Sequence, residues 1–167
     1  MKKILILLLF IASYSTAINA QEQSYKSLEL KIDSLQQQVD KLTHDYQFLD
    51  CSSKLDRFNL TLSNYINGLR NSVDRLMITI YHDRTYDAKM YRVTKMDYDA
   101  SAGLLEDYKS QVSILKWSAS VSAEAYAFSE SEMNLLDATF KAIDSAINSA
   151  EISLEYYKQV LGVYRDL

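Results

Sequence analysis

Residues 46–58 read YQFLDCSSKLDRF, and two apolar heptad patterns meet within them. The first pattern ends at Leu49 and the second begins at Leu55, so these leucines are six residues apart rather than seven. Ser53 is a good N-cap candidate, because a serine hydroxyl can accept a hydrogen bond from an unpaired N–H of a first helical turn. This stretch predicts that one helix ends near Asp50 and another begins near Lys54. One long helix with a local discontinuity is the alternative.

The segment upstream, residues 21–50, carries a narrow apolar seam with polar neighbours. Its heptad a positions are Tyr25, Ile32, Val39 and Tyr46, and its d positions are Leu28, Leu35, Leu42 and Leu49. A seam that uses only a and d is typical of a coiled coil, whereas a helix buried in a globular core needs a wider stripe. We therefore expect residues 21–50 to form a peripheral or self-associating helix, with Leu28, Leu35, Leu42 and Leu49 as candidate interaction residues.

The segment downstream, residues 54–167, shows wider apolar stripes and is expected to form the bundle core. One stripe passes through Leu55, Leu62, Leu69 and Leu76, and another runs from Met133 to Tyr164. Ser129 and Glu132 have the spacing of a capping box before the last stripe. Between the two stripes, the pattern of residues 86–128 predicts a helix, which residues 97–103 could kink. Residues 115–125 alternate as a strand would, although their Ala, Ser and Glu content favours helix.

The composition supports long helices. The chain has no proline and only three glycines in 167 residues. A sheet-rich domain needs frequent turns, which usually depend on these two residues. We therefore predict an all-α fold, a long antiparallel bundle of about four helices with coiled-coil-like packing.

Residues 1–20 read as an export signal. Lys2 and Lys3 precede the apolar run ILILLLFIA, and small residues follow up to Ala20. The apolar run is shorter than the roughly 20 residues that span a bilayer. We expect cleavage and a periplasmic or secreted protein without stable membrane insertion. Removal of residues 1–20 would change the net charge of the chain from −4 to −6. An acidic chain argues against a nucleic-acid partner.

No group of residues predicts catalysis, a metal or a cofactor. The histidines are His44 and His82, and Cys51 is the single cysteine. His44 and Cys51 are two helical turns apart, roughly 10 Å, which is too far for a nucleophile and its base. Cys51 falls on the outward f position or in the predicted bend. It is expected to be a free thiol at a turn, with an intermolecular disulfide as the alternative.

Tyrosine is the compositional excess, with 13 residues. Several of these lie on the apolar stripes, where a ring can pack while its hydroxyl reaches water: Tyr46, Tyr108, Tyr126, Tyr157 and Tyr164. Tyr91, Tyr98 and Tyr156 lie off the stripes. They could line a protein-binding face, or they could be the isolated exposed aromatics that are common on soluble proteins.

These patterns favour an exported, non-enzymatic helical protein that acts as an interaction or scaffold module in the cell envelope or the extracellular space. Its protein partner is not indicated, and a homo-oligomer is one option. A periplasmic holdase-type chaperone, or an inhibitor of a secreted partner, is the alternative and would need an apolar groove between helices. An enzyme that acts on an envelope polymer through helix carboxylates is a third hypothesis, and it would need two acids that converge in a pocket.

Overall fold

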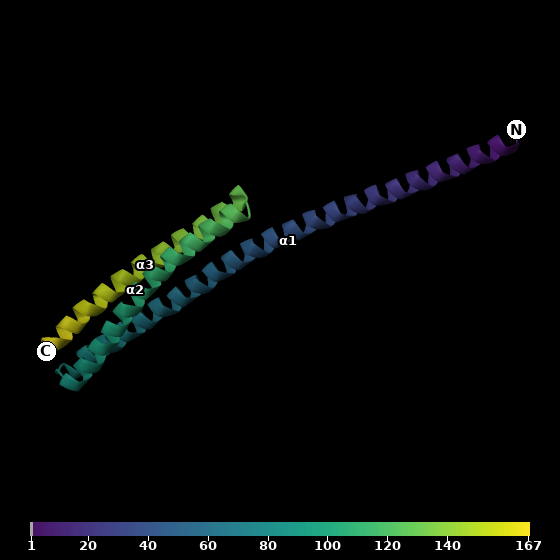
Figure 1. Cartoon of the computed structure of the whole chain (residues 1–167). Coiled ribbons are helices and arrows are strands. Elements are labelled where there is room, and N and C mark those ends of the chain that lie inside the picture. Colours follow the sequence, from purple (N-terminus) through teal and green to yellow (C-terminus); the bar gives the residue numbers. More distant parts are fainter. Residues whose placement is uncertain (1) are drawn as a thin grey trace. The chain divides into compact units, whose positions relative to one another are not determined.

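A computed structural model describes the backbone of residues 2–167 and the side chains of residues 21–82 and 84–167. It contains α1 (Lys2–Asp83), α2 (Ala88–Ala125) and α3 (Glu130–Arg165), as Figure 1 shows, and no residue of the described backbone lies in a strand. The predicted all-α class is confirmed. The predicted export signal, residues 1–20, lies outside the residues whose side chains are described.

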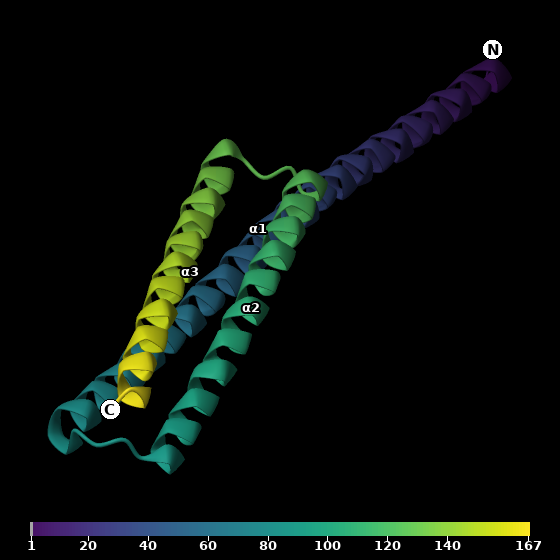
Figure 2. The ribbon, with the colours of Figure 1, turned by 90° about the vertical axis from the view of Figure 1, so that its left-hand side faces the viewer.

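The chain divides into two compact units, Met1–Asp45 and Tyr46–Leu167. The described part of the first unit belongs entirely to α1. The second unit contains the remainder of α1 together with α2 and α3, which form an antiparallel bundle of three helices (Figure 2). Short connections join these helices, as expected when neighbours run antiparallel.

The helix break predicted at Cys51–Ser53 is wrong, because α1 continues through these residues. The described backbone accordingly contains three helices where about four were expected. Two serines do not break a helix, since their propensity is only moderately below that of alanine. The six-residue step from Leu49 to Leu55 therefore marks a change in the buried face of one helix, and the predicted division between 21–50 and 54–167 falls inside α1.

Side-chain caps begin the two shorter helices. The Asp87 carboxylate accepts hydrogen bonds from the N–H groups of Lys89 and Met90, at 2.7 and 3.2 Å. Ser129 and Glu132 form the predicted capping box, which is confirmed: Glu132 Oε2 accepts from the Ser129 N–H at 2.8 Å, and Ser129 Oγ accepts from the Glu132 N–H. These bonds satisfy backbone donors that a helix start leaves unpaired.

Both turns use left-handed backbone at residues other than glycine. Arg84, before α2, has φ of 49°, and Ala127, before α3, has φ of 51°. A side chain in this region costs roughly 1 kcal/mol, because its Cβ approaches the following carbonyl oxygen. The chain thus reverses direction twice without glycine. Between the turns, residues 115–125 are helical, so the strand alternative for them is wrong.

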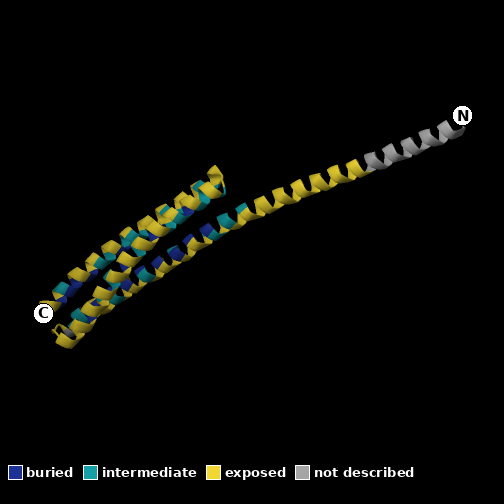
Figure 3. Ribbon diagram, viewed as in Figure 1, coloured by how far each residue is buried: buried dark blue, intermediate teal, exposed yellow. Residues whose placement is uncertain are grey.

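Three groups of buried side chains form the core along the bundle (Figure 3). The first contains Cys51, Leu55, Phe58, Leu62, Val112, Leu136 and Ile143. The second contains Ile66, Leu105 and Ala150. The third contains Leu69, Val73, Leu76, Tyr157, Val160, Leu161 and Tyr164. Apart from Cys51 and Val160, the buried residues of α1 and α3 lie on the predicted stripes, so these stripes are confirmed as core faces.

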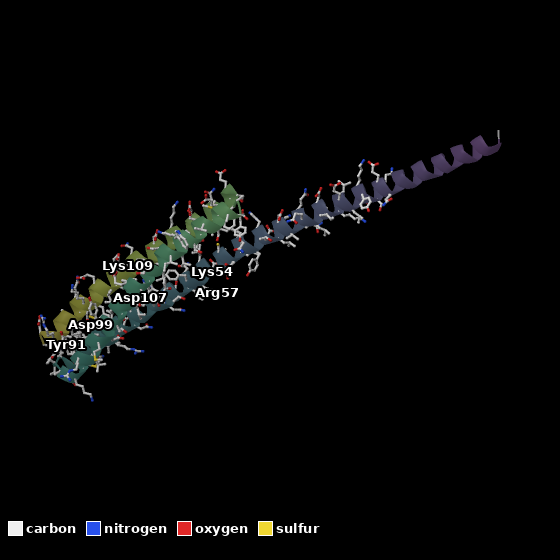
Figure 4. The ribbon with its side chains drawn as sticks, viewed as in Figure 1. Lys54, Arg57, Tyr91, Asp99, Asp107 and Lys109 are labelled. Atoms are coloured by element: carbon white, nitrogen blue, oxygen red, sulfur yellow. The ribbon has the colours of Figure 1, made fainter. Side chains whose placement is uncertain are left out.

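Ion pairs join the outer surfaces of α2 and α3. Lys109, labelled in Figure 4, has its Nζ 2.8 Å from Glu106 on its own helix and 2.6 Å from Glu151 on α3. The hydrogen bonds to Glu106 and then Glu151 raise the pKa of Lys109 above its ordinary value. About two turns further along α2, Lys116 Nζ lies 2.8 Å from Asp144 Oδ2 on α3. Such exposed pairs contribute at most about 1 kcal/mol each, so apolar burial remains the main source of stability.

Candidate functional site

An exposed row of apolar side chains lies on α1. In the first unit it consists of Tyr25, Leu28, Ile32, Leu35, Val39 and Leu42, each between 53% and 68% exposed. In the second unit, Tyr46 and Leu49 are 66% and 64% exposed. We call these eight residues the seam. They are the predicted a and d positions, and residues 21–43 of α1 are all exposed, shown in yellow in Figure 3.

The seam is unusual because it is continuous in register. Single exposed leucines are normal on soluble proteins, but contiguous apolar patches mark interaction sites. Each seam side chain would remove roughly 80 Å² of apolar surface from water if it were covered. Of the predicted interaction residues, Leu28, Leu35 and Leu42 are exposed in the first unit, and Leu49 is exposed in the second unit.

Among the described residues of α1, Cys51 is the first that is buried, two residues after the last seam leucine, although the half-buried Phe48 already packs against the first core group. Cys51 is 7% exposed and belongs to the first core group with Leu55 and Phe58. Two residues correspond to a rotation of about 200° around a helix. Leu49 and Cys51 therefore point to nearly opposite sides of α1, which explains why one is exposed and the other buried.

The predicted position of Cys51 in a bend is wrong, as is its outward orientation. The residue lies within α1 and packs in the core as a small apolar side chain. Assigning Cys51 to the upstream heptad caused the error, because it is the first member of the downstream stripe, four residues before Leu55. Burial of the Cys51 thiol argues against an intermolecular disulfide. Non-reducing electrophoresis tests whether such a disulfide forms.

Of the three tyrosines predicted to line a face, only Tyr156 is exposed, at 48%. Tyr91 and Tyr98 are half-buried and pack against the third core group. The Tyr98 ring meets the Tyr157 ring edge-on at 5.7 Å between centroids, and Tyr86 lies between Tyr91 and Tyr164 at 5.7 and 6.0 Å. The structure therefore does not place Tyr91, Tyr98 and Tyr156 on one open surface.

The hydroxyls of the buried tyrosines bond within the bundle, contrary to the expectation that they reach water. Tyr157 Oη donates to Asp97 Oδ2 at 3.0 Å, and the Asp87 N–H donates to Tyr164 Oη at 3.3 Å. Burial, followed by the bond to Asp97, raises the pKa of Tyr157. These bonds link α2 and its N-cap to α3, and heptad spacing carries no signal for them because the partners are 60 and 77 residues apart.

A third tyrosine, Tyr65, joins α1 to α2. Tyr65 Oη donates to the Ser101 carbonyl oxygen at 2.7 Å, and its ring packs edge-on against Tyr108 at 5.3 Å. Burial, with a smaller contribution from Tyr108, raises the pKa of Tyr65 to about 12. The tyrosine excess within the bundle is thus largely structural.

A groove of about 440 Å³ lies between α2 and α3. Its apolar side chains include Ala119, Leu136 and Phe140, and charged side chains such as Lys141 border it. Lys116 lies over the Phe140 ring at 5.9 Å while it contacts Asp144 at 2.8 Å. The groove could hold an extended apolar segment, which is the feature expected of the chaperone or inhibitor alternative.

The two histidines and the cysteine occupy separate places among the described residues. Cys51 and His82 lie on α1 in the second unit, 31 residues apart and so about 46 Å along the axis. His44 belongs to the first unit, where its Nδ1 lies 3.2 Å from Asp45 Oδ1. Among the described residues, no three His, Cys, Asp or Glu side chains form a group that could hold a metal ion. No helix within the described residues is both long and apolar enough to cross a membrane.

Comparison of the chain with family models, curated proteins and solved structures yields no match.

Proposed function

We propose that this protein is an exported, non-enzymatic helical module that binds another helix through the seam and so acts as a scaffold in the cell envelope or the extracellular space. The exposed seam supports this proposal. Its leucines keep heptad spacing from Leu28 to Leu49, and each is more than half exposed. A row of this kind fits the apolar face of a second helix, because knobs at a and d insert into holes on the facing helix.

The self-contained core of the bundle also favours the proposal. Residues 46–167 contain a bundle with its own core, and that bundle does not need the first unit's seam to bury its apolar stripe. We propose that residues 1–20 direct export and are removed, residues 21–50 supply the coiled-coil-like binding helix, and residues 54–167 supply the folded body. This assignment needs neither cofactor nor metal.

Capture of partners by the tagged mature chain, Gln21–Leu167, tests the binding role of the seam. We expect Leu35→Glu/Leu42→Glu to abolish capture, because two carboxylates on the seam cannot be buried against a helix. Leu30→Glu is the matched control, since Leu30 is 70% exposed on the same helix but lies off the seam. Equal capture by all three chains would refute a binding role for the seam.

Cell fractionation tests export. The full chain is expected in the periplasm or the medium with residues 1–20 removed, and a chain that begins at Gln21 is expected to stay in the cytoplasm. Mass spectrometry of the purified protein locates the cleavage point. Retention of an intact N-terminus in the cytoplasm would refute export.

The groove between α2 and α3 supports one alternative function, a holdase-type chaperone or an inhibitor of a secreted partner. Its apolar lining and charged border suit a short apolar segment of another protein. Phe140→Glu would place a charge in this groove and is expected to end suppression of client aggregation under the alternative. The seam proposal instead predicts that Phe140→Glu leaves partner capture unchanged, provided that circular dichroism shows a folded bundle.

A further inference from the structure

We infer that the partner of the seam is a second copy of this chain, paired with it in an antiparallel two-stranded coiled coil. The inference rests on the proposed function, because it takes the seam as the binding surface and names what covers it. Three properties of the described residues carry it: the side-chain types on the seam, the area that they expose, and the charges beside them.

The side-chain types favour two strands. Ile32 and Val39 are β-branched and occupy a positions, and every d position holds leucine. In parallel coiled coils this combination favours two strands over three or four, so it supports pairing, and the orientation is decided by the register and the charges below. With about 80 Å² per side chain, the eight exposed seam residues would bury roughly 650 Å² on each copy, near the roughly 800 Å² per partner of a standard protein interface.

An antiparallel arrangement pairs the whole seam in a single register. In such a pair each a residue of one copy packs against a d residue of the other. The register that leaves no seam residue unpaired sets Tyr25 against Leu49 of the second copy, Leu28 against Tyr46, Ile32 against Leu42, and Leu35 against Val39. Each tyrosine then faces a leucine, whereas a parallel pair would set Tyr25 and Tyr46 against their own counterparts.

The charges that flank the seam distinguish the two orientations. In the antiparallel register, the g residue Lys31 faces the g residue Asp45 of the second copy, and symmetry produces this attraction twice. In a parallel pair, the g residue Asp45 faces the e residue Asp50 of the second copy, and this repulsion also occurs twice. Lys31 would then face the uncharged Gln36. The attractive pair therefore exists only in the antiparallel arrangement.

The one acidic pair in the antiparallel register is Glu22 with Asp50 of the second copy, at the ends of the seam. Both carboxylates already have a cationic partner on their own helix. Lys26 Nζ lies 3.0 Å from Glu22, and Lys54 Nζ lies 2.6 Å from Asp50. These lysines weaken the repulsion at the ends, and Lys54 weakens the Asp45–Asp50 repulsion of a parallel pair in the same way. The Lys31–Asp45 attraction, which only the antiparallel register forms, therefore carries the distinction between the two orientations.

Charge reversal tests the orientation in sedimentation equilibrium of Gln21–Leu167. Asp45→Lys is expected to weaken the dimer about tenfold, since two exposed attractions become repulsions. Lys31→Glu is expected to act similarly, and Lys31→Glu/Asp45→Lys to restore association. Asp33→Lys is the control, because Asp33 lies at an outward b position. A tighter dimer for Asp45→Lys would overturn the antiparallel arrangement, since a parallel pair loses its Asp45–Asp50 repulsion.

Disulfide trapping provides a second readout, with Cys51→Ala as the background. An equal mixture of Leu28→Cys and Tyr46→Cys chains is expected to yield a cross-linked heterodimer, because these positions face each other in the antiparallel register. Leu28→Cys alone is expected to stay uncross-linked, since its two copies lie about 27 Å apart along the axis. Rapid cross-linking of Leu28→Cys alone would show a parallel pair and overturn the inference.

The measurements also distinguish failure of the inference from failure of the proposed function. A strictly monomeric wild-type chain at high concentration overturns pairing with a second copy. If Leu35→Glu/Leu42→Glu still abolishes capture of another protein in that case, the seam remains a binding surface for a different helix. If the substitutions change neither association nor capture, both the inference and the proposed function are refuted.

Discussion

The seam and the downstream stripe of α1 have similar apolar patterns but opposite environments. Leu28, Leu35 and Leu42 repeat every seven residues, as Leu55, Leu62 and Leu69 do. The first three are more than half exposed, and the last three are at most 2% exposed. The difference lies in width. The downstream stripe adds side chains such as Phe58 and Ile66 beside its leucines and packs against α2 and α3. A heptad pattern thus predicts a helix with an apolar face, and the width of that face indicates how many neighbours cover it.

Truncation of equivalent leucines should produce the largest contrast between the two regions. Leu62→Ala is expected to lower the free energy of unfolding by about 3 kcal/mol, because it leaves a cavity where the side chain is fully buried. Leu35→Ala is expected to change it by less than about 0.5 kcal/mol at concentrations where the chain is monomeric. Urea unfolding measures both values. Similar losses for the two variants would mean that the seam is buried within the monomer.

Thiol labelling should locate the boundary between the regions. Cys51 is buried, whereas Ser53, two residues further along the same helix, is exposed. We expect a thiol reagent to label Cys51 at least about tenfold more slowly than the cysteine of Cys51→Ala/Ser53→Cys, since reaction at Cys51 requires local opening. Equal rates would place Cys51 outside the core. Non-reducing electrophoresis of the same samples tests the intermolecular disulfide.

High pH should weaken the bundle through its buried tyrosines. The pKa of Tyr65 is raised to about 12, so between about pH 10 and 12 the folded chain holds a proton that the unfolded chain releases. The free energy of unfolding must therefore fall as pH rises through this window. The raised pKa of Tyr157 acts in the same direction.

Tyr65→Phe isolates this contribution. The substitution is expected to cost about 1 kcal/mol at neutral pH, because the bond to the Ser101 carbonyl oxygen is lost, and to reduce the decline above pH 10. Thermal unfolding as a function of pH measures both effects. Tyr156→Phe is the control, since Tyr156 is exposed and should change neither. An unaltered decline in Tyr65→Phe would contradict the assigned environment.

The smallest expected change in the free energy of unfolding concerns Ala127, in the turn between α2 and α3. Ala127 has φ of 51°, which glycine adopts without strain. Ala127→Gly is expected to raise the free energy of unfolding by up to about 1 kcal/mol. Ala138→Gly, at an exposed position inside α3, is expected to lower it by roughly as much. Calorimetry compares the two variants, and destabilisation by both would argue against strain at Ala127.

Periodicity was sufficient to predict most of the fold. The stripes from Leu55 to Leu76 and from Met133 to Tyr164 follow helical spacing, and Ser129 with Glu132 marked the start of α3. The break at Cys51–Ser53 was predicted wrongly because an offset in the leucines is the same whether a helix ends or its buried face changes. Serines occur at helix starts and on helix surfaces alike, so they did not resolve the ambiguity.

The candidate site was predictable only in part. The seam followed from residue types alone, because a and d positions repeat within one continuous segment. The roles of Tyr91 and Tyr98 did not, since both pack against the third core group, whose members come from other helices, and Tyr98 meets Tyr157 of α3. Contacts between residues this far apart in the chain have no local pattern, and one sequence contains no direct record of them.

The rotation of about 200° between Leu49 and Cys51 has a consequence for how this chain can change. Substitutions on the two sides of α1 should contribute additively to stability and to association, because no side chain serves both surfaces and additivity holds for residues without shared partners. The seam could then acquire a new partner by point substitution without loss of the bundle. The bundle could likewise gain or lose stability without altering what the seam binds.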